Sequence, residues 1–265
     1  PAGVRKSVTN YDEGLTGLEV RAFDNNALAG TPEHASLNFD NSNGLGFTDW
    51  GTGAPSGLPS GDNWSARVTG NMSFSTAGTY NFQVWSNVGY RVWIDNQLVL
   101  DQWADPDVNP SGWTAVSSPS GTYNKSPEGS YVATANSSVP VRVEIKDETG
   151  RASFALLQRL LPSTAFNQIT ASFLTPQLGL ATATVDADGH ITRTGYTGGS
   201  VSPVFGLPSA TTTETSPANL VESYTHETTY LRRTSRTLPG GTGTTVQYVH
   251  TNGTRNSPCD SATSV

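Results

Sequence analysis

The sequence contains one cysteine, Cys259, among its 265 residues. A single thiol excludes an intrachain disulfide and any zinc or redox site that needs two or more thiolates. Charged residues are scarce too, at 14% of the chain against about 25% in ordinary globular proteins. Gly, Ser, Thr and Asn take their place, and this composition argues against coiled coils and helical bundles.

Positive charge and long apolar runs are also missing. The net charge is -7, and the basic residues are scattered apart from Arg232, Arg233 and Arg236. We therefore expect no nucleic-acid partner. No segment approaches the ~20 consecutive apolar residues that cross a bilayer, so we expect no membrane insertion.

Alternation of apolar and polar residues is frequent before residue 160. A period of two places apolar side chains on one face of a strand, whereas no stripe with the helical period persists for three turns. The sequence therefore predicts an all-β fold. Three alternating sets should form the core: Leu18, Val20 and Ala22; Trp64, Ala66 and Val68; and Tyr80, Phe82 and Val84.

Two segments have the pattern of β-hairpins. The first is centred on Asp95-Asn96, a pair that tolerates the positive φ of a tight turn, with Val92 and Ile94 before it and Leu98 and Leu100 after it. The second places residues 139–145 and 152–156 on either side of Thr149-Gly150. We expect this second hairpin to close the first domain.

The pattern changes after Leu161-Pro162 to short strand-like pieces with many Thr and Gly. We therefore expect two domains, residues 1–162 and residues 163–265. Long Gly- and Pro-rich loops within the first domain, at residues 40–62 and 104–130, are where binding would reside.

The first domain resembles the PA-14 domain (PA14), a β-sandwich module named after anthrax protective antigen and found in glycosidases, adhesins and flocculins. The resemblance extends from Gly14 to Leu157 and implies a jelly-roll-like sandwich that commonly recognises carbohydrate. It rests on Gly14-Leu15-Thr16-Gly17, on Asn63 to Gly70, on Gly78 to Phe82, on Gly89 to Asn96 with Leu98 to Trp103, and on Glu144 to Ala152.

The second domain resembles Rhs or YD repeats at Val185 to Arg193 and again at Tyr224 to Arg233. Such repeats form β-hairpins that build a large shell in surface and toxin-delivery proteins, and each repeat needs neighbours to cover its faces. The resemblance implies a partial segment of Rhs/YD-like hairpins whose partner is the remainder of the shell.

The sugar-binding relatives of the PA-14 domain hold calcium with two consecutive aspartates, joined by a cis peptide, in the turn before the Gly-x-Arg strand. Asn87 and Val88 stand at those positions here. Calcium takes six to eight oxygens, several of them anionic, and this pair offers one neutral amide and backbone carbonyls. We therefore expect no metal and no cofactor at this turn.

The loop after Trp103 has oxygen-bearing side chains at every second position, as calcium loops do. Pro110 and Val116 stand where an EF-hand would have Gly and Glu, so that interpretation fails, and a solvated acidic loop is the alternative. The resemblance places sugar specificity in this loop, where Trp113 would offer a flat face to a sugar ring or act as a packing anchor. The candidate carbohydrate-binding residues are Asn87, Asp105, Asp107, Asn109 and Trp113.

Two further tryptophans, Trp85 and Trp93, alternate with core-facing residues and should point away from the core. If the turn at residues 87–89 joins their strands, both rings share a face with Arg91. A patch of this kind would be covered by another part of the protein.

No enzymatic motif stands out. The four histidines are dispersed, no Gly-x-Ser-x-Gly or His-Glu-x-x-His sequence occurs, and the paired acids Asp147-Glu148 and Asp105-x-Asp107 carry no mark of burial. We therefore predict a non-catalytic carbohydrate-binding or adhesion module of a secreted or cell-surface bacterial protein, with glycans as partners. The alternatives are a structural plug or scaffold of an Rhs shell without sugar binding, and a protein-binding adhesin that uses the same loops.

Overall fold

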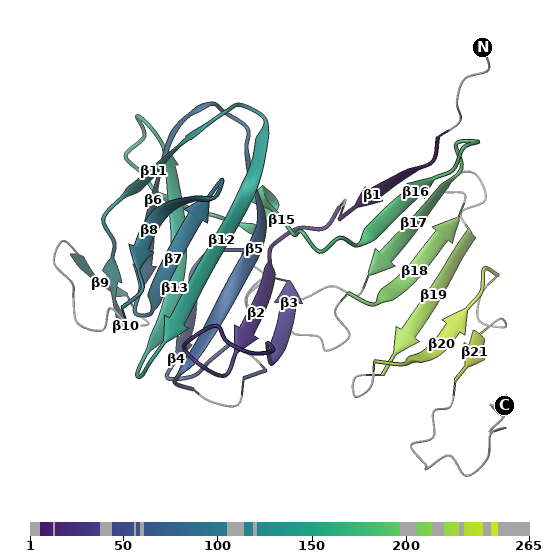
Figure 1. Ribbon diagram of the computed structural model, residues 1–265, viewed down its shortest axis with the longest axis horizontal. Coiled ribbons are helices and arrows are strands. Elements are labelled where there is room, and N and C mark those ends of the chain that lie inside the picture. The colour runs from purple at the N-terminus through teal and green to yellow at the C-terminus, as the bar shows by residue number, and fades with distance from the viewer. Residues whose placement is uncertain are drawn as a thin grey trace, which may run out of the picture. The chain divides into compact units, whose positions relative to one another are not determined.

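The computed structural model describes residues 6–12, 14–37, 44–55, 57–58, 61–104, 114–118, 121–196, 206–213, 220–227, 231–240 and 245–248. Apart from one three-residue 3-10 helix, the regular elements of these residues are β-strands, so the predicted all-β class is confirmed. Two compact units are present (Figure 1). The sandwich unit contains the described residues from 15 to 178, and the sheet unit contains those of the first 14 positions and those after 178.

The sandwich unit has two antiparallel sheets. The β12 sheet has the order β3-β2-β5-β12-β7-β8, with β15 also paired to β5; the β6 sheet has the order β14-β13-β6-β10-β9, with β11 paired to β6 and β4 to β13. The strands of the β12 sheet are β2 (Glu19–Phe23), β3 (His34–Leu37), β5 (Trp64–Phe74), β7 (Gly89–Ile94), β8 (Gln97–Gln102), β12 (Ser137–Asp147) and β15 (Leu174–Thr175). Those of the β6 sheet are β4 (Thr48–Gly51), β6 (Gly78–Ser86), β9 (Thr114–Ser118), β10 (Gly121–Lys125), β11 (Gly129–Ala133), β13 (Ala152–Leu160) and β14 (Asn167–Gln168).

The core lies between the two sheets. All three alternating sets predicted from the sequence are buried there, as period-two alternation requires. Trp64 is fully buried and meets Trp50 edge to face, with 5.2 Å between the ring centroids. The predicted core of the sandwich is therefore confirmed.

The hairpin at Asp95 and Asn96 is also confirmed, because both residues have positive φ, 51° and 61°, and β7 pairs directly with β8. One detail differs. The register shifts between Val92 and Trp93, so Leu98 lies opposite Trp93 and is 50% exposed. The extra residue of such a bulge turns the side chains beyond it to the other face, and only Leu100 joins the core.

The pairing predicted for the closing hairpin is wrong. β12 pairs with β5 and β7, whereas β13 pairs with β6, so the turn at Thr149-Gly150 crosses from one sheet to the other. The connection from β6 to β7 does the same, which places Trp85 and Trp93 on different sheets. Alternation fixes which face of a strand is buried, and two strands of one hairpin or of opposed sheets satisfy it equally.

The segment from 163 to 178 belongs to the sandwich unit, although the sequence placed a boundary before it. β14 pairs with β13, and β15 pairs with β5 on the other sheet. Between them, Ile169 and Leu174 are buried in the core, on either side of the short 3-10 helix Ala171–Phe173. Ile169 and Leu174 are five positions apart, a spacing that fits neither the period of a strand nor that of a helix, which is why the sequence pattern missed them.

The sheet unit is a single antiparallel sheet of order β1-β16-β17-β18-β19-β20-β21 (Figure 1). Ala183 is the one apolar residue that is buried among its described residues. The two segments that resemble Rhs/YD repeats coincide with antiparallel pairs, β16 with β17 and β19 with β20, and their family assignment stays a prediction. The strands are β1 (Val8–Tyr11), β16 (Ala181–Val185), β17 (Ile191–Tyr196), β18 (Pro208–Thr213), β19 (Leu220–His226), β20 (Arg233–Thr237) and β21 (Thr245–Gln247).

Candidate carbohydrate-binding site

The turn between β6 and β7 is fastened to β13. The backbone N–H of Asn87 donates to the carbonyl of Ser153 at 3.1 Å, and the Asn87 Oδ1 accepts from the Ser153 hydroxyl at 2.7 Å. The buried Ser86 hydroxyl lies 2.9 Å from the carbonyl oxygen of Val88 and accepts from the Val88 N–H at 3.0 Å. These polar groups of the turn are therefore engaged in hydrogen bonds that stabilise the turn and attach it to β13.

The residues of this turn do not fit the calcium site of the sugar-binding relatives. Val88 is fully buried within the apolar core, and the carboxamide oxygen of Asn87 is engaged by Ser153. Among the described residues the one cis peptide joins Leu161 and Pro162, so the bond between Asn87 and Val88 is trans. No group of three or more His, Cys, Asp or Glu side chains that suits a metal occurs within the part of the chain that the structure describes.

The remaining predicted site residues lie in the loop between β8 and β9, outside the described residues: Asp105, Asp107, Asn109 and Trp113. The beginning of the loop is described, and it passes over the turn. A Cβ at Gly89 would lie 2.6 Å from the carbonyl oxygen of Trp103 and 3.2 Å from that of Ala104. A glycine at residue 89 is what allows this close approach.

The other end of the loop returns to the same region. Thr114, the first residue of β9, pairs with Lys125 of β10, and Lys125 pairs in turn with Trp85 of β6, two residues before Asn87. Both ends of the loop therefore flank the turn that carries Asn87. The sequence resemblance grouped the turn and the loop into one site, and that site stays a prediction.

A second polar surface lies on the outer face of the β12 sheet, where cations and indole rings alternate. The Arg142 guanidinium carbon lies 3.8 Å from the centre of the Trp93 ring, and that of Arg91 lies 5.5 Å from Trp93 and 4.0 Å from Trp103. The Lys146 ammonium completes the row at 5.5 Å from Trp103. Each such contact is worth ~0.5–1 kcal/mol at an exposed position, so the row stiffens this face.

Glu144 neutralises part of this surface. Its side chain is 5% exposed and accepts from Arg67 Nε at 2.9 Å and from Arg91 Nη2 at 2.7 Å. The two arginines come from the strands on either side, β5 and β7, because Glu144 lies opposite both in the register. A carboxylate this deeply buried needs such partners.

Beside the row is a shallow hollow of about 170 Å³, lined by Trp93 and Arg142, by the amides of Asn96 and Gln177, and by Thr69 over Gly70. Ordinary small-molecule pockets measure ~300–1,000 Å³, so the hollow would receive one substituent of a ligand while the rest of that ligand lies on the surface around it. No sequence pattern predicts this hollow. Its residues are far apart in the chain, and the outward charges of β12 were the one available signal.

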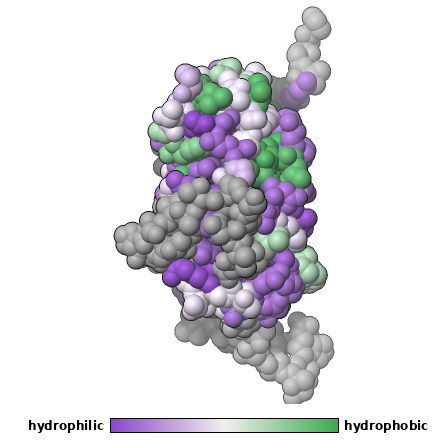
Figure 2. All heavy atoms as spheres, turned by 90° about the vertical axis from the view of Figure 1, so that its left-hand side faces the viewer, coloured by the Kyte–Doolittle hydropathy of each residue, from purple (hydrophilic) through white to green (hydrophobic). Residues whose placement is uncertain are grey.

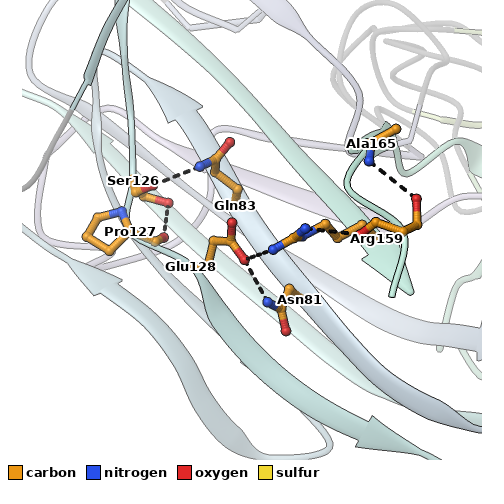
Figure 3. A network of polar contacts seen from close by, with 8 residues as sticks. Asn81, Gln83, Ser126, Pro127, Glu128, Arg159 and Ala165 are labelled. Carbon is orange, nitrogen blue, oxygen red and sulfur yellow. Dashed lines mark hydrogen bonds and ion pairs between the residues drawn. The ribbon is translucent and has the colours of Figure 1, made fainter. Parts of the chain in front are cut away.

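Figure 3 shows a third cluster, on the outer face of the β6 sheet. Glu128 accepts from Arg159 at 2.7 Å and from Asn81 at 2.6 Å, and the hydrogen bond from Arg159 is the main cause of the lowered pKa of Glu128. Gln83 donates to the carbonyl of Ser126 at 3.1 Å. These contacts fasten the segment before β11 to β6 and β13, which is a structural role.

The side of the molecule shown in Figure 2 is largely hydrophilic on its described atoms, with small, separate hydrophobic patches. Large hydrophobic side chains that are exposed in the sandwich unit, such as Leu98, Val132 and Phe173, come from different strands and connections. Surfaces of this kind suit polar ligands better than an apolar partner.

The fold and these surfaces define an antiparallel β-sandwich module with polar outer faces on both sheets. The family model of the PA14 domain matches residues 14–158, and the chain belongs to the PA14 domain family. A curated relative, the anti-sigma-I factor RsgI3 of Acetivibrio thermocellus, is 36% identical over 55 residues, which is 21% of this chain and 8% of the relative.

Solved structures with similar folds include an anti-sigma factor domain-containing protein, at a TM-score of 0.49 and 22% identity over 62% of this chain and 49% of that one. A PA14 sugar-binding domain from an RTX adhesin gives a TM-score of 0.47 and 14% identity over 62% of this chain and 100% of that one. The chain thus spans only a small part of its curated relative and about half of the first of these structures.

Proposed function

We propose that the sandwich unit is a non-catalytic carbohydrate-binding module, and that its site is the end of the sandwich formed by Asn87 and the loop at residues 104–113. Membership of the PA14 family supports a binding role. The location is supported by the two ends of the loop. The loop begins next to Gly89 and ends at Thr114, which pairs with Lys125, and Lys125 pairs with Trp85, so both ends flank Asn87.

The chemistry of the loop suits a sugar. Asp105, Asp107 and Asn109 supply oxygens that accept hydrogen bonds from hydroxyls, and Trp113 supplies a flat apolar face for a ring. A site of this kind buries little surface and displaces water from each hydroxyl, so we expect a dissociation constant of ~1 mM, about -4 kcal/mol, for a monosaccharide. Adhesion would then depend on many copies on one surface.

Recognition at this end is proposed to be independent of calcium. Val88 is buried in the core where the family has a second aspartate, and Asn87 is held by Ser153. Two neutral positions cannot replace a pair of carboxylates as ligands for a divalent cation.

A hydrolytic role has little support from the geometry. Glycosidases need two carboxyl groups that flank the scissile bond. Asp147 is fully buried, whereas Glu148 is 47% exposed and pairs with Lys146 at the surface. Neighbouring residues at the end of a strand point to opposite faces, so these two acids do not share a cleft.

The sheet unit is proposed to be a partial Rhs/YD-like segment of a secreted or cell-surface protein, whose faces are covered by further repeats. Ala183 is the one apolar residue buried among the described residues of this unit, which supports the proposal because one layer of sheet has no core of its own. No helix in the described part of the chain is long and apolar enough to cross a membrane. A structural plug without sugar binding is the competing function, favoured by the same observation.

A glycan array, probed with the full chain in calcium and in chelator, tests the proposal. We expect binding to a defined set of glycans with equal intensity in both buffers. Trp113→Ala should abolish that binding and leave the melting temperature unchanged, since a ring reserved for ligand contributes little to the core. If no glycan binds, or if Trp113→Ala unfolds the sandwich unit, the structural role replaces recognition.

A further inference from the structure

The outer face of the β12 sheet is positively charged, although the protein as a whole carries a net charge of -7. Strands β2, β5, β7, β8 and β12 direct five cationic side chains outward against three carboxylates: Arg21, Arg67, Arg91, Arg142 and Lys146 against Glu19, Glu144 and Asp101. A local surplus of cations on an acidic protein favours anionic ligands at that face.

Four of the five cations have a carboxylate partner within the sheet and its turns. Arg67 and Arg91 share Glu144, Arg21 pairs with Glu19 at 2.9 Å, and Lys146 pairs with Glu148. Arg142 has no carboxylate partner among the described residues. Of these five cations, Arg142 is therefore the one that an anionic ligand can pair without displacing a carboxylate.

Arg142 is also held in place. Its guanidinium lies over Trp93 at 3.8 Å, and the register sets it between Thr69 on β5 and Trp93 on β7. Stacking on an indole ring restricts the side chain and leaves the edge of the planar fork available for hydrogen bonds. A guanidinium that is ordered before binding loses less entropy when it pairs with an anion.

The hollow beside Arg142 supplies neutral hydrogen-bonding groups and no carboxylate. It is lined by the amides of Asn96 and Gln177 and by the hydroxyl-bearing Thr69, and Gln177 is oriented by a 2.9 Å hydrogen bond to Asn71. One fixed cation surrounded by amides and a hydroxyl matches a small ring that carries one carboxylate and several hydroxyls.

We propose that this hollow binds the carboxylate of an acidic sugar, a uronic acid residue, with Arg142 pairing the carboxylate while Asn96 and Gln177 take adjacent hydroxyls. The proposal rests on the proposed carbohydrate recognition and adds a second subsite, on the outer face of the β12 sheet. The sandwich unit then distinguishes acidic from neutral polysaccharide by a contact that the loop end does not make.

Matched ligands isolate the contact. The methyl glycosides of glucuronate and galacturonate differ from those of glucose and galactose only in the carboxylate, and binding to the full chain is followed by NMR through the Trp93 indole signal. A charge-assisted hydrogen bond is worth ~1.5–3 kcal/mol, so we expect each uronide to bind at least about tenfold tighter than its neutral parent. Arg142→Gln should remove that preference.

Arg21→Gln is the matched control, because it makes the same change of charge on the same sheet at an exposed arginine that already has a partner. We expect it to keep the preference, and Arg142→Lys to keep part of it, since lysine retains the charge without the planar fork. Equal loss in Arg142→Gln and Arg21→Gln would show a diffuse charge effect and would overturn the proposal. Tighter binding of oligoglutamate than of the uronides would assign the hollow to an acidic peptide and also overturn it.

The two proposals fail separately. If neutral glycans bind in a Trp113-dependent manner and the uronides show no preference, the acidic-sugar subsite is wrong and recognition at the loop end stands. If the uronide preference depends on Arg142 while Trp113→Ala changes nothing, the hollow is a site and the loop end is not.

Discussion

Removing residues 163–178 should destabilise the sandwich unit severely, although the sequence pattern ends the domain before them. Ile169 and Leu174 are at most 1% exposed, and burying such a side chain is worth ~1.5–3 kcal/mol. Together they contribute ~3–6 kcal/mol, a large part of the ~5–15 kcal/mol by which a typical domain is stable. The segment also accepts backbone hydrogen bonds from Leu45 and Gly17, both at 3.0 Å.

The assay compares two fragments, residues 15–178 and residues 15–162, by urea unfolding monitored through tryptophan fluorescence. We expect the longer fragment to unfold cooperatively and the shorter one to lose at least ~3 kcal/mol, which lowers its melting temperature by about 6 °C or more. Equal stability of the two fragments would refute the reasoning, because it would mean that Ile169 and Leu174 lie on the sandwich without stabilising it.

A point substitution tests the same contact without truncation. Gly44 has φ +67°, and a Cβ there would lie 2.7 Å from the Ala171 nitrogen and 2.9 Å from Leu174 Cδ1. Gly30 has φ +80° with open space around it, so Gly30→Ala carries the backbone strain without the clash. Gly44→Ala should therefore lower the free energy of unfolding clearly more than Gly30→Ala does. Similar losses in the two variants would mean that backbone strain alone causes them and that the contact with residues 171–174 adds nothing.

Three further outcomes are expected. A calcium site of ~10 μM affinity would add ~2.7 kcal/mol of stability at 1 mM calcium. Since Asn87 and Val88 replace the aspartates, we expect the same melting temperature in calcium and in chelator. A rise of several degrees in calcium would instead assign a calcium site to the loop after Trp103. Trp64→Ala should cost ~3–5 kcal/mol through the cavity left by a fully buried ring, and a loss under ~1 kcal/mol in urea unfolding would contradict the described core. Glu128→Gln should cost up to ~1 kcal/mol of stability at pH 7. Because Arg159 lowers the pKa of Glu128 in the folded state, the wild type is more stable than the variant above the pKa that glutamate has in the unfolded chain, and this difference disappears as the pH falls through the pKa of Glu128 in the folded state. An equal loss of stability at pH 7 and pH 3 would mean that packing, and not charge, causes it.

Alternation gave the strands and their buried faces correctly because it depends only on residues two apart. Tyr80, Phe82 and Val84 face the core whatever β6 pairs with. Pairing depends on partners far along the chain, and the turns at residues 87–89 and 149–150 join strands of different sheets. An arch between sheets and a hairpin within one have the same local sequence pattern, so the hairpin prediction at Thr149-Gly150 failed.

Strand pairing in the sheet unit was harder still to predict. β1 pairs with β16, whose residues follow it by 170 positions or more, as in the pair Val8 and Val185. Nothing local in Val8–Tyr11 indicates that partner, and the Asp12 carboxylate that accepts from the N–H groups of Gly179 and Leu180 is an ordinary acid in the sequence. Long-range pairing of short strands leaves no periodic trace.

The acidic-sugar subsite shows where a local signal stops. In the sequence, Arg142, Glu144 and Lys146 alternate as outward charges of one strand. Nothing in that pattern indicates which of them is available to bind a ligand. Because β12 is paired on both sides, Glu144 lies between Arg67 and Arg91 and forms an ion pair with each of them. Arg142, two residues before Glu144 on the same face, lies between Thr69 and Trp93 instead, so no carboxylate lies opposite it on either neighbouring strand. Which of two identical guanidinium groups on a sheet can bind a ligand is thus decided by its cross-strand neighbours, and these are known only once the register is known.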